Sequence, residues 1–187
     1  PPIVPPIIDK CEGKFKPYER DLERWARRWA LPGTPGLEHR VGGLEKAEHG
    51  AISSDPQNHE IMVANRAEKV ARVANYIPDL EVVGNQEGDV LIVGWGGTYG
   101  HLYTATKQLI EEGKNVGFAH FDYINPLPKN TKDVFKRFKK IIVCELNSGQ
   151  FVSYLRGLNP EFTFEQLNKV QGQPFIVKEI VDAVNAL

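Results

Sequence analysis

The stretch DVLIVGWGGTYG, residues 89–100, combines an apolar run, a glycine-rich turn and the start of a helix. Its apolar part predicts a strand over Asp89–Trp95 that is buried on both faces, because it lacks the alternation of a half-exposed strand. The residues Tyr99–Glu112 that follow predict a helix, which Gly113 closes. A buried strand that turns at once into a helix is typical of α/β domains, so this stretch predicts that class of fold.

Strands and helices alternate along the rest of the C-terminal half. Leu80–Val83 predicts a short strand, and the turn GNQEGD that joins it to residues 89–95 predicts a hairpin, so that one strand runs antiparallel. Further strands are predicted at residues 115–121, 141–145 and 174–177, and further helices at 129–138, 150–158 and 178–187. The sequence therefore predicts a mixed five-stranded sheet with one antiparallel strand, covered by helices on both faces as a three-layer sandwich.

The chain divides into three predicted segments. Residues 1–54 are a linker segment rich in proline and glycine, in which the apolar spacing over Tyr18–Trp29 predicts one short helix. Residues 55–78 predict a long surface helix with Asp55 as its N-cap and an apolar stripe on one face. Residues 79–187 form the α/β domain. We expect the following residues to be exposed as a candidate interface: Trp25, Trp29 and the stripe Val63, Ala67, Val70, Ala74 and Ile77.

Composition excludes several classes of function. The formal net charge of −1 over 187 residues lacks the basic excess of a nucleic-acid-binding surface. The longest apolar runs have the length of strands, so we expect no membrane-spanning helix, and no signal peptide is visible. Cys11 and Cys144 are the only cysteines, too few for a disulfide framework, and a cytoplasmic location fits them. The five histidines contain no i, i+4 pair, so no metal site is predicted.

The glycine-rich turn has two alternative roles. Free N–H groups and the positive end of a helix dipole meet at such a turn, and Asp122 ends the next strand where a ribose-binding acid would fall. An independent nucleotide- or anion-binding module is therefore one alternative. However, the spacing G-x-G-x-x-G would require glycine where Tyr99 stands, and no lysine occupies the Walker position. We therefore favour a tight turn that packs against a partner or another domain, built from Gly96, Gly97, Thr98, Tyr99 and Gly100.

A second polar stretch is CELNSGQF, residues 144–151. Its hydrogen-bonding groups at one strand end suit a polar interface with another backbone, and they belong to Glu145, Asn147, Gly149 and Gln150. The alternative that we favour is that Glu145 and Asn147 cap the next helix. A third alternative pairs Glu145 with Asp122 for acid–base chemistry, because both lie at carboxyl ends of strands. Cys144 lies inside a strand-like run and is predicted to be a small buried hydrophobe. We therefore assign no catalytic residue.

Several stretches together resemble one protein family. TPGLEHRVGGLEKAEHGAISSDPQNHEIMVANRAEKV, residues 34–70, resembles the segment that follows the thiamine-type domain in alpha subunits of 2-oxoacid:ferredoxin oxidoreductases, above all the 2-oxoglutarate (KorA-like) branch. Four later stretches resemble, in order, the C-terminal domain of the same subunit: DVLIVGWGGTYG, VGFAHFDYINPLP, IIVCELNSGQF and VQGQPF. The resemblance runs from about Gly33 to the end of the sequence.

The resemblance implies an intact enzyme that oxidatively decarboxylates a 2-oxoacid such as 2-oxoglutarate with coenzyme A and passes the electrons to ferredoxin. It implies thiamine diphosphate, Mg²⁺ and iron–sulfur clusters in that complex. For residues 79–187 it implies a fold similar to the transketolase C-terminal domain, a mixed five-stranded sheet with one antiparallel strand. The implied partners are the missing N-terminal domains of the same subunit, a separate beta subunit and ferredoxin.

The chain departs from what catalysis in this family requires. Cluster binding needs several cysteines at short spacings, whereas Cys11 and Cys144 lie far apart in the sequence. In the family, the glutamate that activates thiamine belongs to the preceding domain, and the beta subunit holds the diphosphate and the metal. The resemblance therefore implies an assembly domain with no cofactor of its own, inactive in isolation. Its glycine turn and residues 145–150 are expected to contact other domains or subunits.

Overall fold

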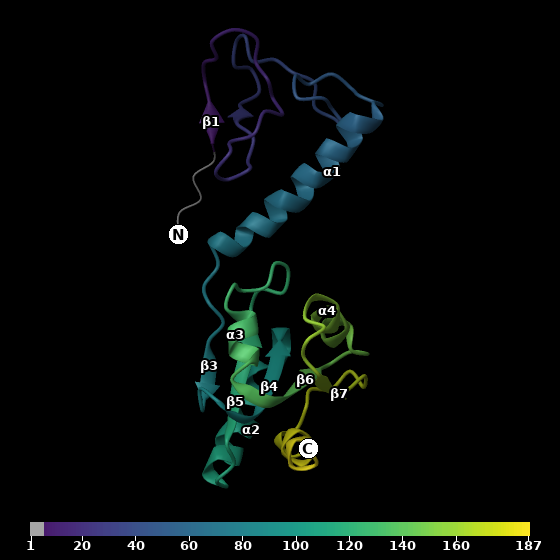
Figure 1. Cartoon of the computed structure of the whole chain (residues 1–187). Coiled ribbons are helices and arrows are strands. Elements are labelled where there is room, and N and C mark those ends of the chain that lie inside the picture. The colour runs from purple at the N-terminus through teal and green to yellow at the C-terminus, as the bar shows by residue number, and fades with distance from the viewer. Residues whose placement is uncertain (1–5) are drawn as a thin grey trace. The chain divides into compact units, whose positions relative to one another are not determined.

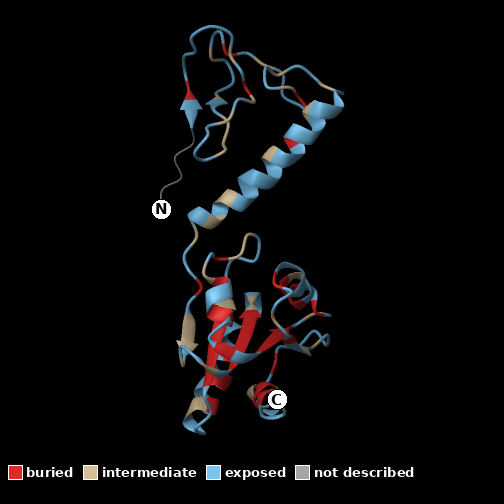
Figure 2. Cartoon of the chain, in the orientation of Figure 1, coloured by how far each residue is buried: buried red, intermediate tan, exposed pale blue. Residues whose placement is uncertain are grey.

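The structure, a computed structural model, describes residues 6–187 of the chain (Figure 1). The chain divides into two compact units, which meet in the sequence between Val73 and Ala74. We call them the N-terminal unit and the C-terminal unit. The proline-rich start that was predicted as a linker includes residues 1–5, which lie outside the described residues. Figure 2 shows that the strands of the C-terminal unit are largely buried, whereas most residues of the N-terminal unit are exposed.

The C-terminal unit is built on one mixed sheet of five strands. In chain order these are β3 (Val82–Gly84), β4 (Gly88–Trp95), β5 (Val116–Phe121), β6 (Phe138–Glu145) and β7 (Phe164–Asn168). Their order across the sheet is β3-β5-β4-β6-β7, and only β3 runs antiparallel to its neighbour. The predicted α/β class, with a mixed five-stranded sheet and one antiparallel strand, is confirmed.

The predicted hairpin between the first two strands of this unit is wrong. β3 pairs with β5, through Val82 opposite Ala119 and Gly84 opposite Gly117, and not with β4. β4 is apolar on both faces, so it lies inside the sheet with parallel neighbours on each side, and no edge is left for β3. The entry to β3 is fixed by Asn130, whose side-chain amide donates to Leu80 O at 2.9 Å and accepts from Leu80 N at 2.7 Å.

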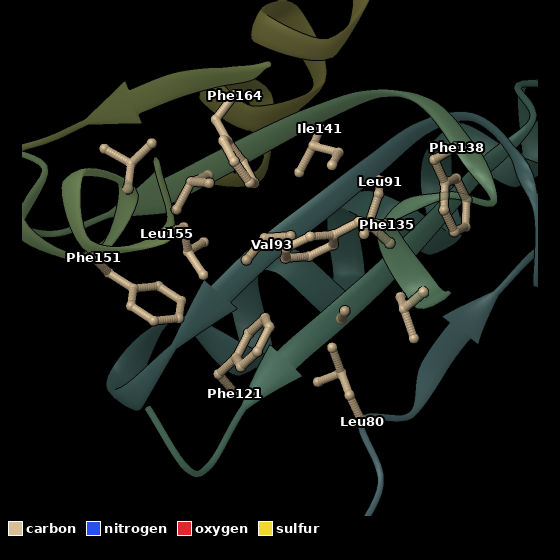
Figure 3. Packing of buried hydrophobic residues seen from close by; sticks show 14 residues of the cluster. Leu80, Leu91, Val93, Phe121, Phe135, Phe138, Ile141, Phe151, Leu155 and Phe164 are labelled. Carbon is tan, nitrogen blue, oxygen red and sulfur yellow. The ribbon is translucent and has the colours of Figure 1, made fainter. Parts of the chain in front are cut away.

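Helices cover both faces of this sheet, which confirms the three-layer arrangement. One face carries α2 (Tyr99–Glu111) and α5 (Val177–Asn185), and the other carries α3 (Thr131–Phe135) and α4 (Gln150–Leu158). The alternation of a strand sends successive β4 side chains to opposite layers. Val90 and Ile92 therefore pack toward α2 and α5, whereas Leu91 and Val93 pack toward α3 and α4. Figure 3 shows the second of these clusters, with the aromatic rings of Phe121, Phe135 and Phe151 around Val93.

The last strand of the sheet lies elsewhere than predicted. The structure has β7 at Phe164–Asn168, and no strand at residues 174–177. The apolar residues of that stretch have other roles. Phe175 is buried in the cluster that α2 and α5 form with the sheet, and Ile176 precedes the first residue of α5. β7 was missed because it is an edge strand in which Glu165 and Gln166 are polar and exposed, so its sequence lacks an apolar run.

The N-terminal unit contains little regular structure. Its elements are β1 (Ile7–Ile8), β2 (Trp29–Ala30), α1 (Pro56–Ala71) and the start of the 3₁₀ turn η1 (Arg72–Asn75). β1 and β2 form a short parallel pair, and irregular chain connects β2 to α1. This unit therefore combines the segments predicted separately as a linker and a surface helix.

The short helix predicted over Tyr18–Trp29 is wrong. The segment forms turns instead, and the Asp21 carboxylate closes one of them by accepting the N–H groups of Glu23 and Arg24 at 3.0 and 2.6 Å. Trp25 adopts a left-handed conformation with φ of 57°, which interrupts a right-handed helix. The spacing of apolar residues did not reveal that the Asp21 side chain competes with helix formation by binding nearby backbone N–H groups.

The surface helix predicted over residues 55–78 corresponds to α1, which ends earlier, at Ala71. Asp55 caps it by accepting the Asn58 N–H at 2.7 Å, and Pro56 stands at its first position. One side of α1 faces the irregular segment, where Asn65 Oδ1 accepts a hydrogen bond from Trp25 Nε1 at 3.2 Å. Val63, Ala67 and Val70 of the predicted stripe are exposed, Val63 by 47 %, whereas Ala74 and Ile77 are half-buried. Of the two tryptophans, Trp29 is exposed and Trp25 is half-buried.

Candidate functional site

The glycine turn joins β4 to α2 through the short 3₁₀ segment η2 (Gly96–Thr98). The Thr98 hydroxyl donates to the Trp95 carbonyl at 2.9 Å and accepts the Trp95 N–H at 3.1 Å. Thr98 is itself buried, and its side chain makes no cap bond to α2. The residue therefore closes the turn onto the end of β4.

Two glycines of this region are required by the fold of the chain itself. A Cβ on Gly94 would lie 2.2 Å from Leu102 Cδ1 and 2.6 Å from Thr98 Oγ1, so no side chain fits there. Gly96 has φ of +58°, which disfavours other residues. Gly97 and Gly100 differ, because a Cβ on either would meet nothing within 4 Å and neither has a positive φ. Within the described residues, nothing requires glycine at these two positions.

The second polar stretch is organised around Glu145, which is completely buried at the end of β6. Its Oε1 accepts the Val152 N–H at 2.8 Å, and its Oε2 accepts the Phe151 N–H at 2.9 Å. The same Oε2 accepts Trp95 Nε1–H at 3.2 Å and Asn147 Nδ2–H at 3.0 Å. The carboxylate thus occupies the N-terminus of α4, where free N–H groups and the helix dipole favour a negative charge.

Asn147 completes this cap. Its Oδ1 accepts the N–H groups of Gly149 and Gln150 at 2.7 and 3.2 Å. Gly149 has φ of +94°, as a left-handed residue immediately before the helix requires. Three of the four predicted site residues of this stretch, Glu145, Asn147 and Gly149, therefore hold the chain's own turn, and Gln150 is exposed. The favoured prediction, that Glu145 and Asn147 cap the next helix, is confirmed.

The proposed acid–base pairing of Glu145 with Asp122 finds no support in the hydrogen bonds of either side chain. Asp122 is 81 % exposed, and its ion-pair contact is with His120 Nε2 at 3.8 Å. His120 Nδ1 is buried and has no hydrogen-bond partner, while the Tyr99 ring lies edge-on to the imidazole at 5.1 Å. Burial lowers the pKa of His120, and the charge of Asp122 opposes that effect.

Two residues of this region were missed from the sequence. Trp95 links the glycine turn to Glu145 across two strands, and His120 lies beside Tyr99 at the end of β5. Both stand at carboxyl ends of parallel strands, which is the signal that would have identified them.

The cysteines do not fit an iron–sulfur cluster. Cys144 is buried in β6, and burial raises the pKa of its thiol to about 12, with the nearby Glu145 charge adding to that effect. Cys11 is exposed in the N-terminal unit. Among residues 6–187 no three His, Cys, Asp or Glu side chains gather as ligands for a metal ion. The donor groups of residues 6–187 are therefore not gathered as a cluster or metal site would require.

The fold and these contacts define the class of protein. It is a mixed α/β domain in which side chains of the chain itself close the end of β6, preceded by a largely irregular N-terminal unit with one long helix. No helix in the part of the chain that the structure describes is long and apolar enough to cross a membrane. No protein-family model matches the chain.

Relatives of known type do match. The chain is 42 % identical over 182 residues to the 2-oxoglutarate oxidoreductase subunit KorA of Mycobacterium tuberculosis, which covers 95 % of this chain and 27 % of that protein. It is 29 % identical to the 2-oxoacid:ferredoxin oxidoreductase 1 subunit alpha of Aeropyrum pernix, over 95 % of this chain and 29 % of that protein. The solved 2-oxoglutarate:ferredoxin oxidoreductase of Magnetococcus marinus matches 94 % of this chain and 31 % of its own, at 33 % identity and a TM-score of 0.83.

The chain is similar to part of the alpha subunits of 2-oxoacid:ferredoxin oxidoreductases, and the resemblance inferred from the motifs is confirmed. It spans less than a third of the length of the three proteins named above. Other domains or subunits accompany the matched segment in those relatives.

Proposed function

We propose that this chain is the C-terminal assembly part of the alpha subunit of a 2-oxoacid:ferredoxin oxidoreductase that acts on 2-oxoglutarate. The observation that carries the proposal is the match along 95 % of the chain at 42 % identity to a 2-oxoglutarate oxidoreductase subunit. The solved relative was determined with 2-oxoglutarate, coenzyme A and succinyl-CoA bound, which supports the same substrate class. A cytoplasmic location belongs to this proposal.

In the proposed complex the 2-oxoacid is oxidatively decarboxylated, coenzyme A receives the acyl group, and ferredoxin accepts the electrons. Thiamine diphosphate, Mg²⁺ and iron–sulfur clusters are held by other parts of that complex, since the donor groups of residues 6–187 are not gathered as a cluster or metal site would require. The partners are the remaining domains of the alpha subunit, a beta subunit and ferredoxin.

The contribution of this chain is a surface for assembly. Glu145, Asn147 and Gly149 are engaged within the chain, which favours contact through the rest of the predicted interface. Thr98 and Gly96 are likewise required by the turn itself, so that remainder is Gly97, Tyr99, Gly100 and Gln150. Tyr99 is 47 % exposed and the two glycines present open backbone, so a partner can approach closely there.

An activity assay tests this proposal. The isolated chain and the full-length subunit with its beta subunit are each given 2-oxoglutarate, coenzyme A, thiamine diphosphate, Mg²⁺ and a viologen as electron acceptor. We expect reduction of the viologen by the complex only. Turnover by the isolated chain, or a complex that is silent with every 2-oxoacid tried, contradicts the proposal.

One observation favours a second candidate, the nucleotide- or anion-binding module. α2 begins without a side-chain cap, so its first N–H groups are available to an anion. Equilibrium dialysis of the isolated chain against NAD, FAD and coenzyme A separates the two candidates. Saturable micromolar binding that Gly97→Val abolishes would favour the module, whereas the assembly proposal expects no such binding.

A further inference from the structure

Exposed apolar side chains of the C-terminal unit gather at one edge of its sheet. We call this the carboxyl edge, meaning the edge at which β4, β5, β6 and β7 end. Six large side chains exposed by 37 % or more lie there: Tyr99, Tyr103, Tyr123, Ile124, Leu146 and Val170. Ile176, at the start of α5, adds a seventh. Two further exposed side chains of the unit lie outside this group: Leu158 ends α4 at the opposite edge, and Tyr76 lies in the segment before β3. A random scatter would not favour one edge in this way.

Charges show the reverse distribution. The loops that follow the four parallel strands are residues 96–98, 122–130, 146–149 and 169–176, and their 24 positions hold three charged residues. The loops at the opposite edge are residues 85–87, 112–115, 136–137 and 159–163, and their 14 positions hold six. Depletion of charge together with enrichment of tyrosine is the composition of the centre of a protein–protein interface.

The backbone of the glycine turn fits such an interface. Gly97 and Gly100 are open to solvent at their Cβ positions, and nothing in the chain requires glycine at either. The rings of Tyr99 and Tyr103 stack beside these glycines, with their centroids 5.9 Å apart. Two amphipathic side chains therefore lie next to a stretch of backbone that no side chain covers. Glycine at an exposed position allows another backbone to approach closely, which explains both residues.

The size of the surface indicates the kind of partner. The seven side chains are exposed by 37 to 70 %, which amounts to roughly 600 Å² if a large side chain presents about 200 Å² when free. A stable contact between two separate proteins buries about 800 Å² on each of them, whereas contacts between domains of one chain begin at about 300 Å² on each. A tethered neighbour needs less area because its effective concentration is high. The three relatives named above carry more than two thirds of their length outside the matched segment, so such a neighbour exists in them.

We infer that the carboxyl edge is the docking surface for another domain of the same alpha-subunit polypeptide. The inference rests on the proposed function and names the surface through which it operates. Its occupant is an apolar surface with few charges, able to bring backbone against Gly97 and Gly100.

Thiol accessibility tests this inference in the full-length subunit and in the isolated chain. In a Cys11→Ser background, one thiol is added by Tyr123→Cys or by Val170→Cys, on two different loops of the carboxyl edge. Its labelling is read by mass spectrometry of the peptide that contains it, so that other cysteines of the full-length subunit do not contribute. The matched control is Lys114→Cys, which is exposed at the opposite edge. The buried native Cys144 does not compete for the maleimide probe. We expect all three thiols to react alike in the isolated chain, and both carboxyl-edge thiols to react at least tenfold more slowly in the full-length subunit while the control is unchanged.

Two outcomes overturn the inference. Equal reactivity of all three thiols in the full-length subunit means that no domain covers the edge. Slow reaction of the carboxyl-edge thiols in the isolated chain means that a second copy, or the chain itself, covers the surface. The reaction rate depends on protein concentration in the first case and not in the second. The viologen assay is scored separately. Activity without protection removes only this inference, and protection without activity removes only the proposed function.

Discussion

Trp95 and Glu145 are joined across the sheet by a hydrogen bond of 3.2 Å from the indole N–H to a carboxylate oxygen, although they lie 50 residues apart in the sequence. The bond links the end of β4, where the glycine turn begins, to the buried cap of α4. Because Glu145 also accepts two backbone N–H groups, one side chain fixes two loops of the carboxyl edge. The geometry of both loops therefore depends on one completely buried side chain.

Replacing this carboxylate should be costly. Glu145→Ala leaves two buried backbone donors and the Trp95 indole without an acceptor, and we expect the free energy of unfolding to fall by about 3 kcal/mol or more. Urea denaturation followed by tryptophan fluorescence measures the change. Asp122→Asn serves as the control, because Asp122 is 81 % exposed, and should change stability by no more than about 0.5 kcal/mol. Similar small effects of both substitutions would refute the capping role.

The glycines of the turn should divide into two groups. Gly94→Ala places a methyl group 2.2 Å from Leu102 Cδ1, and we expect a loss of about 1–3 kcal/mol through overpacking. Gly100→Ala meets no neighbour and lies in α2, so stability should be unchanged or rise by up to about 1 kcal/mol. Thermal unfolding of the isolated chain compares the two variants. An equal loss in both would show that Gly100 is needed by the fold.

His120 should make stability depend on pH. Burial lowers the pKa of the folded-state imidazole below its ordinary 6.5, so the unfolded chain binds its proton more readily. The contribution is fully present above about pH 6.5 and is lost as pH falls toward the folded-state pKa. We expect the stability of the parent chain to decline more steeply than that of His120→Gln between roughly pH 7 and 5. Parallel curves would contradict this assignment. Asp122→Asn should steepen the decline, because Asp122 opposes the lowered pKa.

The two cysteines should differ in reactivity. Burial raises the pKa of Cys144 to about 12, so its thiol stays protonated and shielded at pH 8, whereas Cys11 is exposed. Titration of the native isolated chain with a disulfide reagent should therefore release one equivalent of chromophore, and titration in denaturant two. Cys11→Ser should remove the native equivalent. Two equivalents from the native chain would mean that β6 opens readily.

The C-terminal unit was predicted well where local pattern decides structure. The apolar run of β4 and the polar turn after β6 have signals within a few residues, so the strand, the helix α4 and the Glu145 cap followed from the sequence. The partner of β3 did not, because the order of strands depends on which strand is buried on both faces. The Trp95 contact was missed for the same reason, since only the parallel alignment of β4 and β6 brings it to Glu145.

The N-terminal unit was predicted less well. Spacing over Tyr18–Trp29 matched a helix, yet the Asp21 side chain and the left-handed Trp25 produce turns. The aromatic residues serve other contacts there, such as the Arg72 guanidinium 4.3 Å above the Trp25 ring. Such contacts join residues far apart in the sequence, and the local spacing of apolar residues does not predict them.

The clamp of Asn130 on Leu80 has a mechanical consequence. Both backbone polar groups of Leu80 are bonded to one side-chain amide, two residues before β3 begins. A pull on the chain from the side of the N-terminal unit meets this clamp first, and then the short antiparallel ladder of β3 on β5. This ladder has three residue pairs, so we expect the edge strand β3 to detach under such a pull before the four parallel strands separate.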